Sequence, residues 1–318
     1  MTSVTVVIPF SNQKHFSPTL RQFVQSPLVE KIYVVHNGGY RDSEPKCEGI
    51  LSSTFAEGRT IGRILSNTLT DHLLVVAQQN PIELSPGALE RFTSVTAETS
   101  AGIVYSDYYA VKNGKKLDHP LIDYQLGSVR DHFDFGALLL LSCKPVRYAI
   151  TKYGLPPDVQ WAGWYDLRLK TSIDASIFHL QESLYSMSES EERPTGERLF
   201  DYVDPRNASV QKEMEDVFTQ YIKNAGAFLA PHFERVPKPV DAFPVVASII
   251  IPVRNRVRTI TDALNSALEQ KTDFPFNVIV VENHSTDGTA EVVAQLNTRD
   301  KRIIRIVPRC RPRYWRVL

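Results

Sequence analysis

The sequence predicts an α/β protein with a doubly wound, mainly parallel sheet, followed by a helical linker and a partial second α/β domain. Three observations support this fold class. Strand-like and helix-like segments alternate along the first half of the chain, which is typical of parallel strands joined by right-handed crossovers. A β-branched run that ends in Ile-Pro occurs twice, at 4–9 and 248–252. The chain has 318 residues, enough for two domains of about 150 residues each.

The first domain is expected at residues 1–190. Its opening strand, 4–8, is β-branched throughout, as in strands buried on both faces, and Pro9 ends it because proline cannot donate to a sheet ladder. The remaining expected strands are 31–35, 72–77, 101–107 and 176–188, and the expected helices are 18–25, 58–69, 85–95 and 161–173. This order predicts a sheet with helices on both faces.

Two of these helices carry clear local signals. The helix at 58–69 has an apolar stripe that includes Ile61, Ile64 and Leu65 at helical spacing. The helix at 85–95 is predicted to begin with Ser85 as its N-cap and Pro86 at its first position.

Residues 191–246 are expected to form a linker that contains one helix. Apolar residues recur on one helical face from Val210 to Ala225, and we expect this helix to pack between the two halves of the chain. Residues 247–318 then repeat the start of the first domain. Strands are expected there at 248–252, 277–281 and 302–307, with helices at about 258–270 and 289–296.

The bulk composition is that of a globular protein. Hydrophobic residues make up 42% and charged residues 23%, and the formal net charge is zero, which argues against nucleic acid as a partner. The longest apolar run, 136–143, is too short to span a bilayer. The sequence begins with a strand-like run and not with a signal peptide. We therefore expect a cytoplasmic protein, and homo-oligomerisation stays open.

The second copy carries a recognisable pair of motifs. "SIIIPVRN" is followed by "VIVVENHSTDGT", and this pair resembles the start of family 2 glycosyltransferases. The first copy resembles the same family through "VVIPFSN", "VVHNGG", "LSPGALERF" and "VYSDYY", in that order. We interpret the chain as a tandem of two such domains, the first complete and the second truncated.

This resemblance implies the GT-A fold, a UDP-sugar donor and a divalent cation, Mn²⁺ or Mg²⁺. It further implies an inverting transfer to a glycan or lipid-linked acceptor that builds a bacterial polysaccharide or glycan. Contacts to the nucleotide sugar are expected at seven positions: Pro9, Asn37, Asp107, Pro252, Asn255, Glu282 and Asp287.

The first copy departs from the family pattern at its acids. Residues 77–79, Ala-Gln-Gln, stand where the family has Asp-x-Asp, and amides do not anchor a hard dication as carboxylates do. A metal here would use Asp107 and Asp134, or Asp131. Asp166 is the expected general base, because inversion needs a carboxylate to take the acceptor's proton. Each acid has a structural alternative. Asp107 would cap the following turn, Asp134 would form a hydrogen bond within its loop, and Asp166 would be a solvated residue on a helix surface.

Three functions stay open from the sequence. The first is an inverting glycosyltransferase, the second a catalytically decayed module that binds a nucleotide sugar or glycan, and the third a structural half of a larger enzyme. The absence of GxGxxG and Walker patterns argues against dehydrogenases and kinases. The basic, aromatic tail from Lys301 to Leu318 either associates peripherally with an anionic membrane or polymer or ends a truncated domain.

Overall fold

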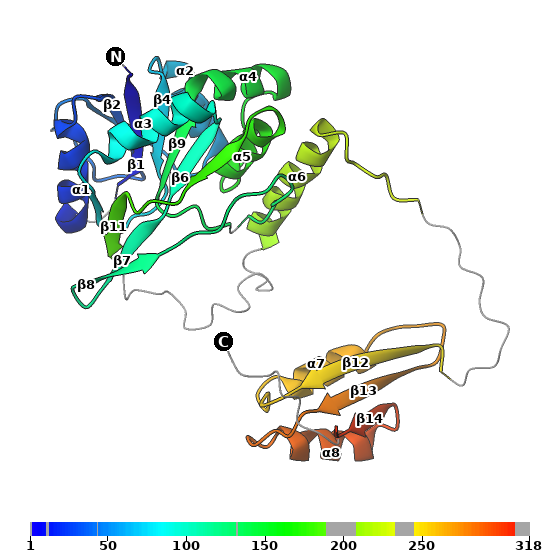
Figure 1. Ribbon diagram of the computed structural model, residues 1–318. Helices are drawn as coiled ribbons and strands as arrows, with labels where there is room; N and C mark the ends of the chain where they lie inside the picture. The colour runs from blue at the N-terminus through cyan, green and yellow to red at the C-terminus, as the bar shows by residue number, and fades with distance from the viewer. Residues whose placement is uncertain are drawn as a thin grey trace. The chain divides into compact units, whose positions relative to one another are not determined.

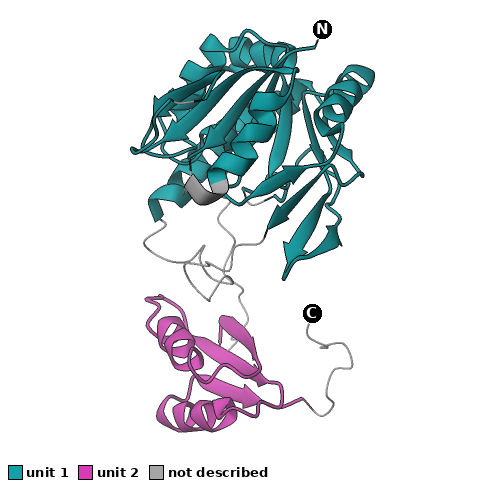
Figure 2. Ribbon diagram, turned by 90° about the vertical axis from the view of Figure 1, so that its left-hand side faces the viewer, with its two compact units in different colours: residues 1–230 teal, residues 231–318 magenta. Residues whose placement is uncertain are grey.

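The computed structural model describes residues 2–10, 13–42, 44–131, 133–188, 208–232 and 245–308, without the side chains of residues 13–15. The chain divides into two compact units, Met1–Ala230 and Pro231–Leu318 (Figure 2). Most of the expected linker, and the tail from residue 309 onward, lie outside the described residues. In the described part of the chain, no helix is both long enough and apolar enough to cross a bilayer.

The first unit is built on a seven-stranded sheet (Figure 1). In spatial order its strands are β10 (Ile177–Leu180), β6 (Ile103–Ser106), β9 (Leu138–Ser142), β4 (His72–Val76), β1 (Val4–Pro9), β2 (Val29–His36) and β3 (Cys47–Leu51). β9 pairs antiparallel with β4 and β6, and the other pairings are parallel. The predicted α/β class with a mainly parallel sheet is confirmed.

Helices cover both faces of this sheet and bury its β-branched strands. The helices of the unit are α1 (Gln13–Gln25), α2 (Gly58–Asn67), α3 (Ala88–Thr99), α4 (Cys143–Tyr153), α5 (Gly163–Asp174) and α6 (Ala208–Asn224). α1 and α3 pack with β1 residues such as Val6 in one hydrophobic cluster. α2, α4 and α5 form a second cluster with Val7 on the opposite face. The predicted α2 stripe of Ile61, Ile64 and Leu65 is buried there.

A smaller sheet of four strands extends the unit. Its spatial order is β5 (Ile82–Leu84), β11 (Tyr185–Ser188), β7 (Tyr108–Lys112) and β8 (Lys115–His119). The strand expected at 176–188 is therefore two strands, β10 and β11, in different sheets. The chain changes sheets between them, and Leu184 donates a backbone hydrogen bond to Asp107 at this crossing.

One helix prediction also needs correction. α3 begins at Ala88 with Gly87, in the left-handed conformation (φ 74°), as its N-cap, whereas the Ser85 hydroxyl bonds to the Ser183 carbonyl. The linker helix α6 belongs to the first unit, where its Val217 and Tyr221 pack with Leu169 of α5.

The second unit holds a three-stranded parallel sheet with two helices. Its elements are β12 (Ala247–Val253), α7 (Ile260–Leu268), β13 (Phe276–Glu282), α8 (Thr289–Arg299) and β14 (Ile303–Ile306). The strand order β12-β13-β14 follows the chain. Ile260 and Leu264 of α7 and Val293 of α8 share one cluster with Val278 and Val280 of β13. Both helices therefore cover the same face of the sheet.

Candidate functional site

The carboxyl ends of the parallel strands define one edge of the large sheet, and ligands of open α/β sheets bind beyond this edge. Asp107 directly follows β6 there, and Asn37 directly follows β2. β9 runs antiparallel to β4, so the loop that precedes it brings Asp134 to the same edge. Pro9 ends β1 and is buried. The topology therefore gathers all four of these predicted positions at one edge.

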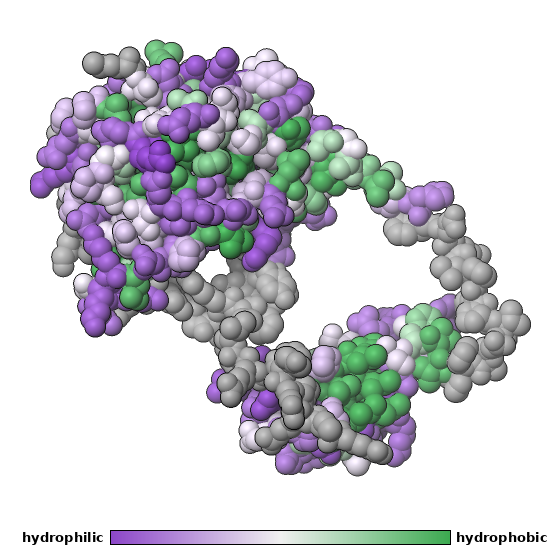
Figure 3. All heavy atoms as spheres, viewed as in Figure 1, coloured by the Kyte–Doolittle hydropathy of each residue, from purple (hydrophilic) through white to green (hydrophobic). Residues whose placement is uncertain are grey.

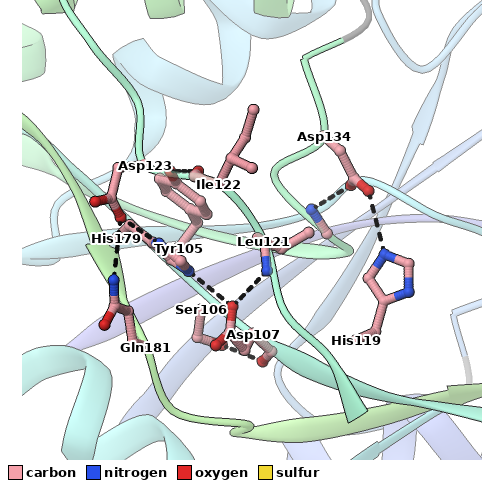
Figure 4. A network of polar contacts seen from close by, with 11 residues as sticks. Tyr105, Ser106, Asp107, His119, Leu121, Ile122, Asp123, Asp134, His179 and Gln181 are labelled. Atoms are coloured by element: carbon pink, nitrogen blue, oxygen red, sulfur yellow. Dashed lines mark hydrogen bonds and ion pairs between the residues drawn. The ribbon is translucent and has the colours of Figure 1, made fainter. Parts of the chain in front are cut away.

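Asp107 takes part in a network centred on His179 of β10 (Figure 4). The Oδ1 atom of Asp107 accepts a hydrogen bond from the Leu121 N–H at 2.7 Å and lies 2.8 Å from His179 Nε2. On the other side of the ring, His179 Nδ1 lies 2.7 Å from Asp123 Oδ1. The imidazole thus stands between two carboxylates, which hold it in place.

The His179 ring is also held by its surroundings. It is buried and stacks on Tyr105, with centroids 4.7 Å apart and planes 8° apart. A carboxylate oxygen lies within hydrogen-bonding distance of each ring nitrogen. The hydrogen bond from His179 holds the pKa of Asp123 below its usual value. The network therefore links Asp107 and Asp123 through the imidazole of His179.

Asp134 has its own partners at the same edge. Its Oδ1 accepts the Gly136 N–H at 2.9 Å, and its Oδ2 lies 3.6 Å from His119 Nε2. The Gly136 bond supports the turn before β9, and this is the structural role predicted for Asp134 as the alternative to metal binding. In Figure 4 the Asp134 and Asp107 carboxylates bond to different partners. These two acids do not share a ligand.

The residues at this edge do not fit a divalent cation. Such a cation needs several oxygen ligands that converge, and the bonded oxygen of Asp107 is occupied by Leu121 and His179. Among the described residues, no group of three His, Cys, Asp or Glu side chains could hold a metal ion. Residues 77–79 are exposed and add only amides and a methyl group. Asp107 and Asp134 together therefore make no metal centre in this conformation.

Asp166, the predicted general base, lies buried in the first turn of α5. Its Oδ2 is 2.7 Å from Nζ of Lys170 one turn later, which is also buried. Burial raises the pKa of Asp166, and Lys170 opposes that shift. The Lys170 ammonium also donates to the carbonyl oxygens of Gly154 and Leu155. This pair ties α5 to the end of α4, and the carboxylate is enclosed.

In the second unit, two loops are bonded to each other at the carboxyl edge of the sheet. Asn255 follows β12 in the left-handed conformation (φ 52°), which asparagine tolerates better than most residues. Its Oδ1 accepts the Thr286 N–H at 2.8 Å, and its own N–H donates to the Ser285 hydroxyl at 3.0 Å. A single side chain thus joins the loop after β12 to the loop after β13.

Asp287 makes the second connection between these loops. Its Oδ2 accepts the Val257 N–H at 3.0 Å, and its Oδ1 accepts the Thr289 N–H at 3.0 Å at the start of α8. The Thr289 hydroxyl in turn accepts the Arg256 N–H at 2.8 Å. These bonds hold the pKa of Asp287 below its usual value, the Thr289 hydroxyl contributing most. Asp287 therefore holds the two loops and the start of α8 together.

Glu282 ends β13 and is buried beneath the same loop. Its Oε1 accepts the Ser285 N–H, and its Oε2 lies 3.4 Å from the Arg305 guanidinium. Burial works to raise the pKa of Glu282, but the Ser285 and Arg305 bonds outweigh it and the pKa falls below its usual value. Pro252, by contrast, is exposed on β12. In this structure Glu282 supports the loop from below.

Two residues of the first-unit network were not found by sequence reasoning. His179 and Asp123 are 56 residues apart, with no motif that links them. The only available signal was a histidine in the expected final strand, parallel to the strand that ends at Asp107. The register of β10 against β6, which pairs His179 with Tyr105, could not be read from the chain.

Comparison with known proteins bears on the second unit. Residues 248–311 match the model of the family described as glycosyl transferase family 2. No curated protein sequence matches the chain. Among solved structures, the chain is similar to S. aureus TarS. For TarS 1-349 with UDP-GlcNAc, the identity is 10%, the coverage 71% of this chain and 73% of that one, and the TM-score 0.46. For the complex with UDP these values are 11%, 70%, 65% and 0.48.

The chain is an α/β protein whose second unit closes the carboxyl edge of a parallel sheet with two mutually bonded polar loops. The matched segment contains both loops. The match to the glycosyl transferase family 2 model therefore falls on the segment whose motifs predict it.

Proposed function

We propose that the chain is an inverting glycosyltransferase whose second unit binds the nucleoside diphosphate of a nucleotide-sugar donor, in the first place UDP. The observation that carries this proposal is that the family match contains the two loops that Asn255 and Asp287 bond together. These loops follow the carboxyl ends of β12 and β13, which is the edge of α/β sheets where ligands bind. The resemblance supplies the UDP-sugar, the glycan or lipid-linked acceptor and the bacterial polysaccharide product.

Charge at this edge suits a diphosphate. Arg254, Arg256 and Arg258 are exposed in the loop that follows β12, and guanidinium groups pair well with phosphate oxygens. In an inverting transfer the acceptor hydroxyl attacks the anomeric carbon, and the bond from that carbon to the diphosphate breaks. The nucleoside diphosphate leaves with the bond electrons, so cationic side chains beside it stabilise the departing charge.

The proton of the acceptor hydroxyl needs a base. Asp166 is the carboxylate that the resemblance places in this role, but its burial and its pairing with Lys170 oppose it. These observations favour a second candidate function, a module that binds the nucleotide sugar without transferring the sugar. The replacement of Asp-x-Asp by residues 77–79 supports the same alternative.

Binding and catalysis are separated by two measurements on the full chain. Titration calorimetry with UDP, with and without Mn²⁺, measures binding, and UDP release from a panel of UDP-sugars measures transfer. Asp287→Asn should weaken UDP binding by about tenfold or more, the equivalent of about 1.4 kcal/mol. The reason is that the Asp287 carboxylate, which accepts the Val257 N–H, holds the loop after β12 in place. Asp262→Asn, on the exposed side of α7, is the matched control and should bind normally.

The outcomes divide the candidates. UDP binding with UDP release supports the transferase, and loss of release in Asp166→Asn would assign the base to Asp166. UDP binding without release from any donor supports the binding module. Donor binding at the second unit is wrong if UDP does not bind to the chain, or if UDP binds Asp287→Asn as tightly as Asp262→Asn.

A further inference from the structure

The first unit contains an apolar cavity of about 260 Å³ between the large sheet and α5. Val75 and Ala77 of the β4 end and Leu139 and Leu141 of β9 line its sheet side. Trp164 lines its helix side, and its indole N–H is already bonded to the Phe55 carbonyl. Ala77 is exposed, whereas Val75 and Leu141 are buried, so the cavity runs inward from the carboxyl edge of the sheet.

Arg168 of α5 also lines this cavity and is only 6% exposed. Its guanidinium donates one hydrogen bond, from Nη2 to the Arg130 carbonyl at 3.0 Å, and among the described residues it makes no ion pair. Its Nε is fully buried without a partner. A guanidinium has five N–H donors and stays charged in proteins. Most of the hydrogen-bonding capacity of this buried cation is therefore unused.

The environment of Arg168 makes burial of its charge unfavourable for the stability of the folded protein. The guanidinium lies 5.2 Å from the ring centre of Phe135 and 4.9 Å from that of Tyr165, and burial lowers its pKa. Asp131 is the acid whose charge reaches it, and Asp131 is exposed. Lys170, two residues further on the same helix, has a buried counter-charge in Asp166 at 2.7 Å. A buried charge without such a partner is strongly unfavourable.

We propose that this cavity binds a small molecule with an apolar body and one carboxylate, and that the carboxylate pairs with Arg168. A guanidinium forms charge-assisted hydrogen bonds with a carboxylate, and the apolar walls accept only the uncharged remainder. An engineered cavity of about 150 Å³ holds benzene, so this one suits a single ring or a short aliphatic chain with an acid group. The cavity lies within the first unit, and the proposal does not depend on donor binding at the second unit.

Ala77 lies at the mouth of the cavity and carries no charge that would repel an anion. An aspartate at this position, which the glycosyltransferase pattern has, would place a negative charge beside the ligand carboxylate. With alanine the entrance is small and uncharged. Ala77→Asp should therefore exclude acids from the cavity while leaving the sheet intact, because position 77 is exposed.

The test uses the full chain and pairs of probes that differ only in charge. Benzoate and phenylacetate are compared with benzyl alcohol and benzamide by titration calorimetry and by shifts in the thermal unfolding temperature. The acids should bind about tenfold or more tightly than the neutral compounds, a difference of about 1.4 kcal/mol. Arg168→Gln should remove this preference for acids. Arg21→Gln, on the exposed side of α1, is the matched control and should keep it.

Thermal unfolding without ligand shows whether a variant has a folding defect. Arg168→Gln should unfold at the wild-type temperature or above it, because it removes a buried charge that forms no ion pair with the described residues. If it unfolds earlier, Ala77→Asp carries the test, since it leaves Arg168 in place. The proposal is overturned if no acid of the panel binds at millimolar concentration, if neutral probes bind equally well, or if the folded variants bind acids as the wild type does.

Discussion

The two units begin with the same strand pair but bury it differently. β1 pairs with β2 through Val7 and Tyr33, and β12 pairs with β13 through Ile250 and Ile279 at the corresponding positions. In the first unit Val7 is 0% exposed, whereas Ile250 is 64% exposed. The same β-branched alternation therefore produces a covered strand in one unit and an open strand in the other.

The cause is the placement of the helices. α2 lays its apolar stripe over the Val7 face in the first unit, whereas α7 and α8 both lie on the opposite face of the second unit. The third strands repeat the contrast, because Ile50 of β3 is 2% exposed and Ile306 of β14 is 45% exposed. Figure 3 shows apolar surface gathered over the strands of the second unit. The pattern of β-branched residues thus predicts a strand, but it does not predict which faces of that strand helices will bury.

The largest expected effect tests this contrast directly. Val7→Asp places a charge in a fully buried site and should destabilise the first unit by about 4 kcal/mol or more. Ile250→Asp, its counterpart, should change the stability of the second unit by less than about 1 kcal/mol, because the side chain faces solvent. Denaturant unfolding followed by hydrogen-exchange mass spectrometry reports each unit separately. An equally large loss for Ile250→Asp would mean that this face is covered in solution.

A smaller effect is expected from the buried carboxylate of each unit. Lys170→Met leaves Asp166 buried without its cation and should cost the first unit about 3–5 kcal/mol. The double variant Asp166→Leu/Lys170→Met should recover most of that loss. Arg305→Gln should cost the second unit less than about 1 kcal/mol, because Arg305 is partly exposed and Glu282 keeps its Ser285 bond. Equal losses in the two units would contradict the comparison.

The smallest effect is a difference in pH dependence. The lowered pKa of Glu282 adds stability that is present above its usual value and is lost as the pH falls through the folded-state pKa. The raised pKa of Asp166 has the opposite sign, and its contribution is lost as the pH rises. Lowering the pH from about 7 to about 4 should therefore weaken the second unit through Glu282 and favour the first through Asp166.

Thermal unfolding across this range, followed by exchange at peptides from each unit, measures the two trends. Glu282→Gln should flatten the pH response of the second unit and leave that of the first unchanged. The sign argument is wrong if the second unit becomes more stable on acidification, or if Glu282→Gln leaves its response as steep as before.

Local sequence signals predicted most of the individual elements. The strands 4–8 and 277–281 and the α2 stripe are runs of neighbouring residues whose pattern matches one secondary structure. Sequence reasoning failed where distant segments decide the outcome. The split of residues 176–188 into β10 and β11 depends on two different sheets that compete for one stretch of chain. The His179 network likewise requires β10 to lie beside β6.

The α/β class, the repeated strand-and-loop opening and the family motifs of the second copy could be predicted from the sequence, because each is encoded by residues close together in the chain. The partners of the carboxylates could be found only in the folded protein. Asp166 is paired with Lys170, Asp107 with His179, and Asp287 with the backbone of two loops. Burial and partners are properties of the packed molecule, because desolvation and hydrogen bonding depend on segments that meet only after folding. For the same reason, only the fold shows that the Arg168 guanidinium is buried without an ion pair to the described residues.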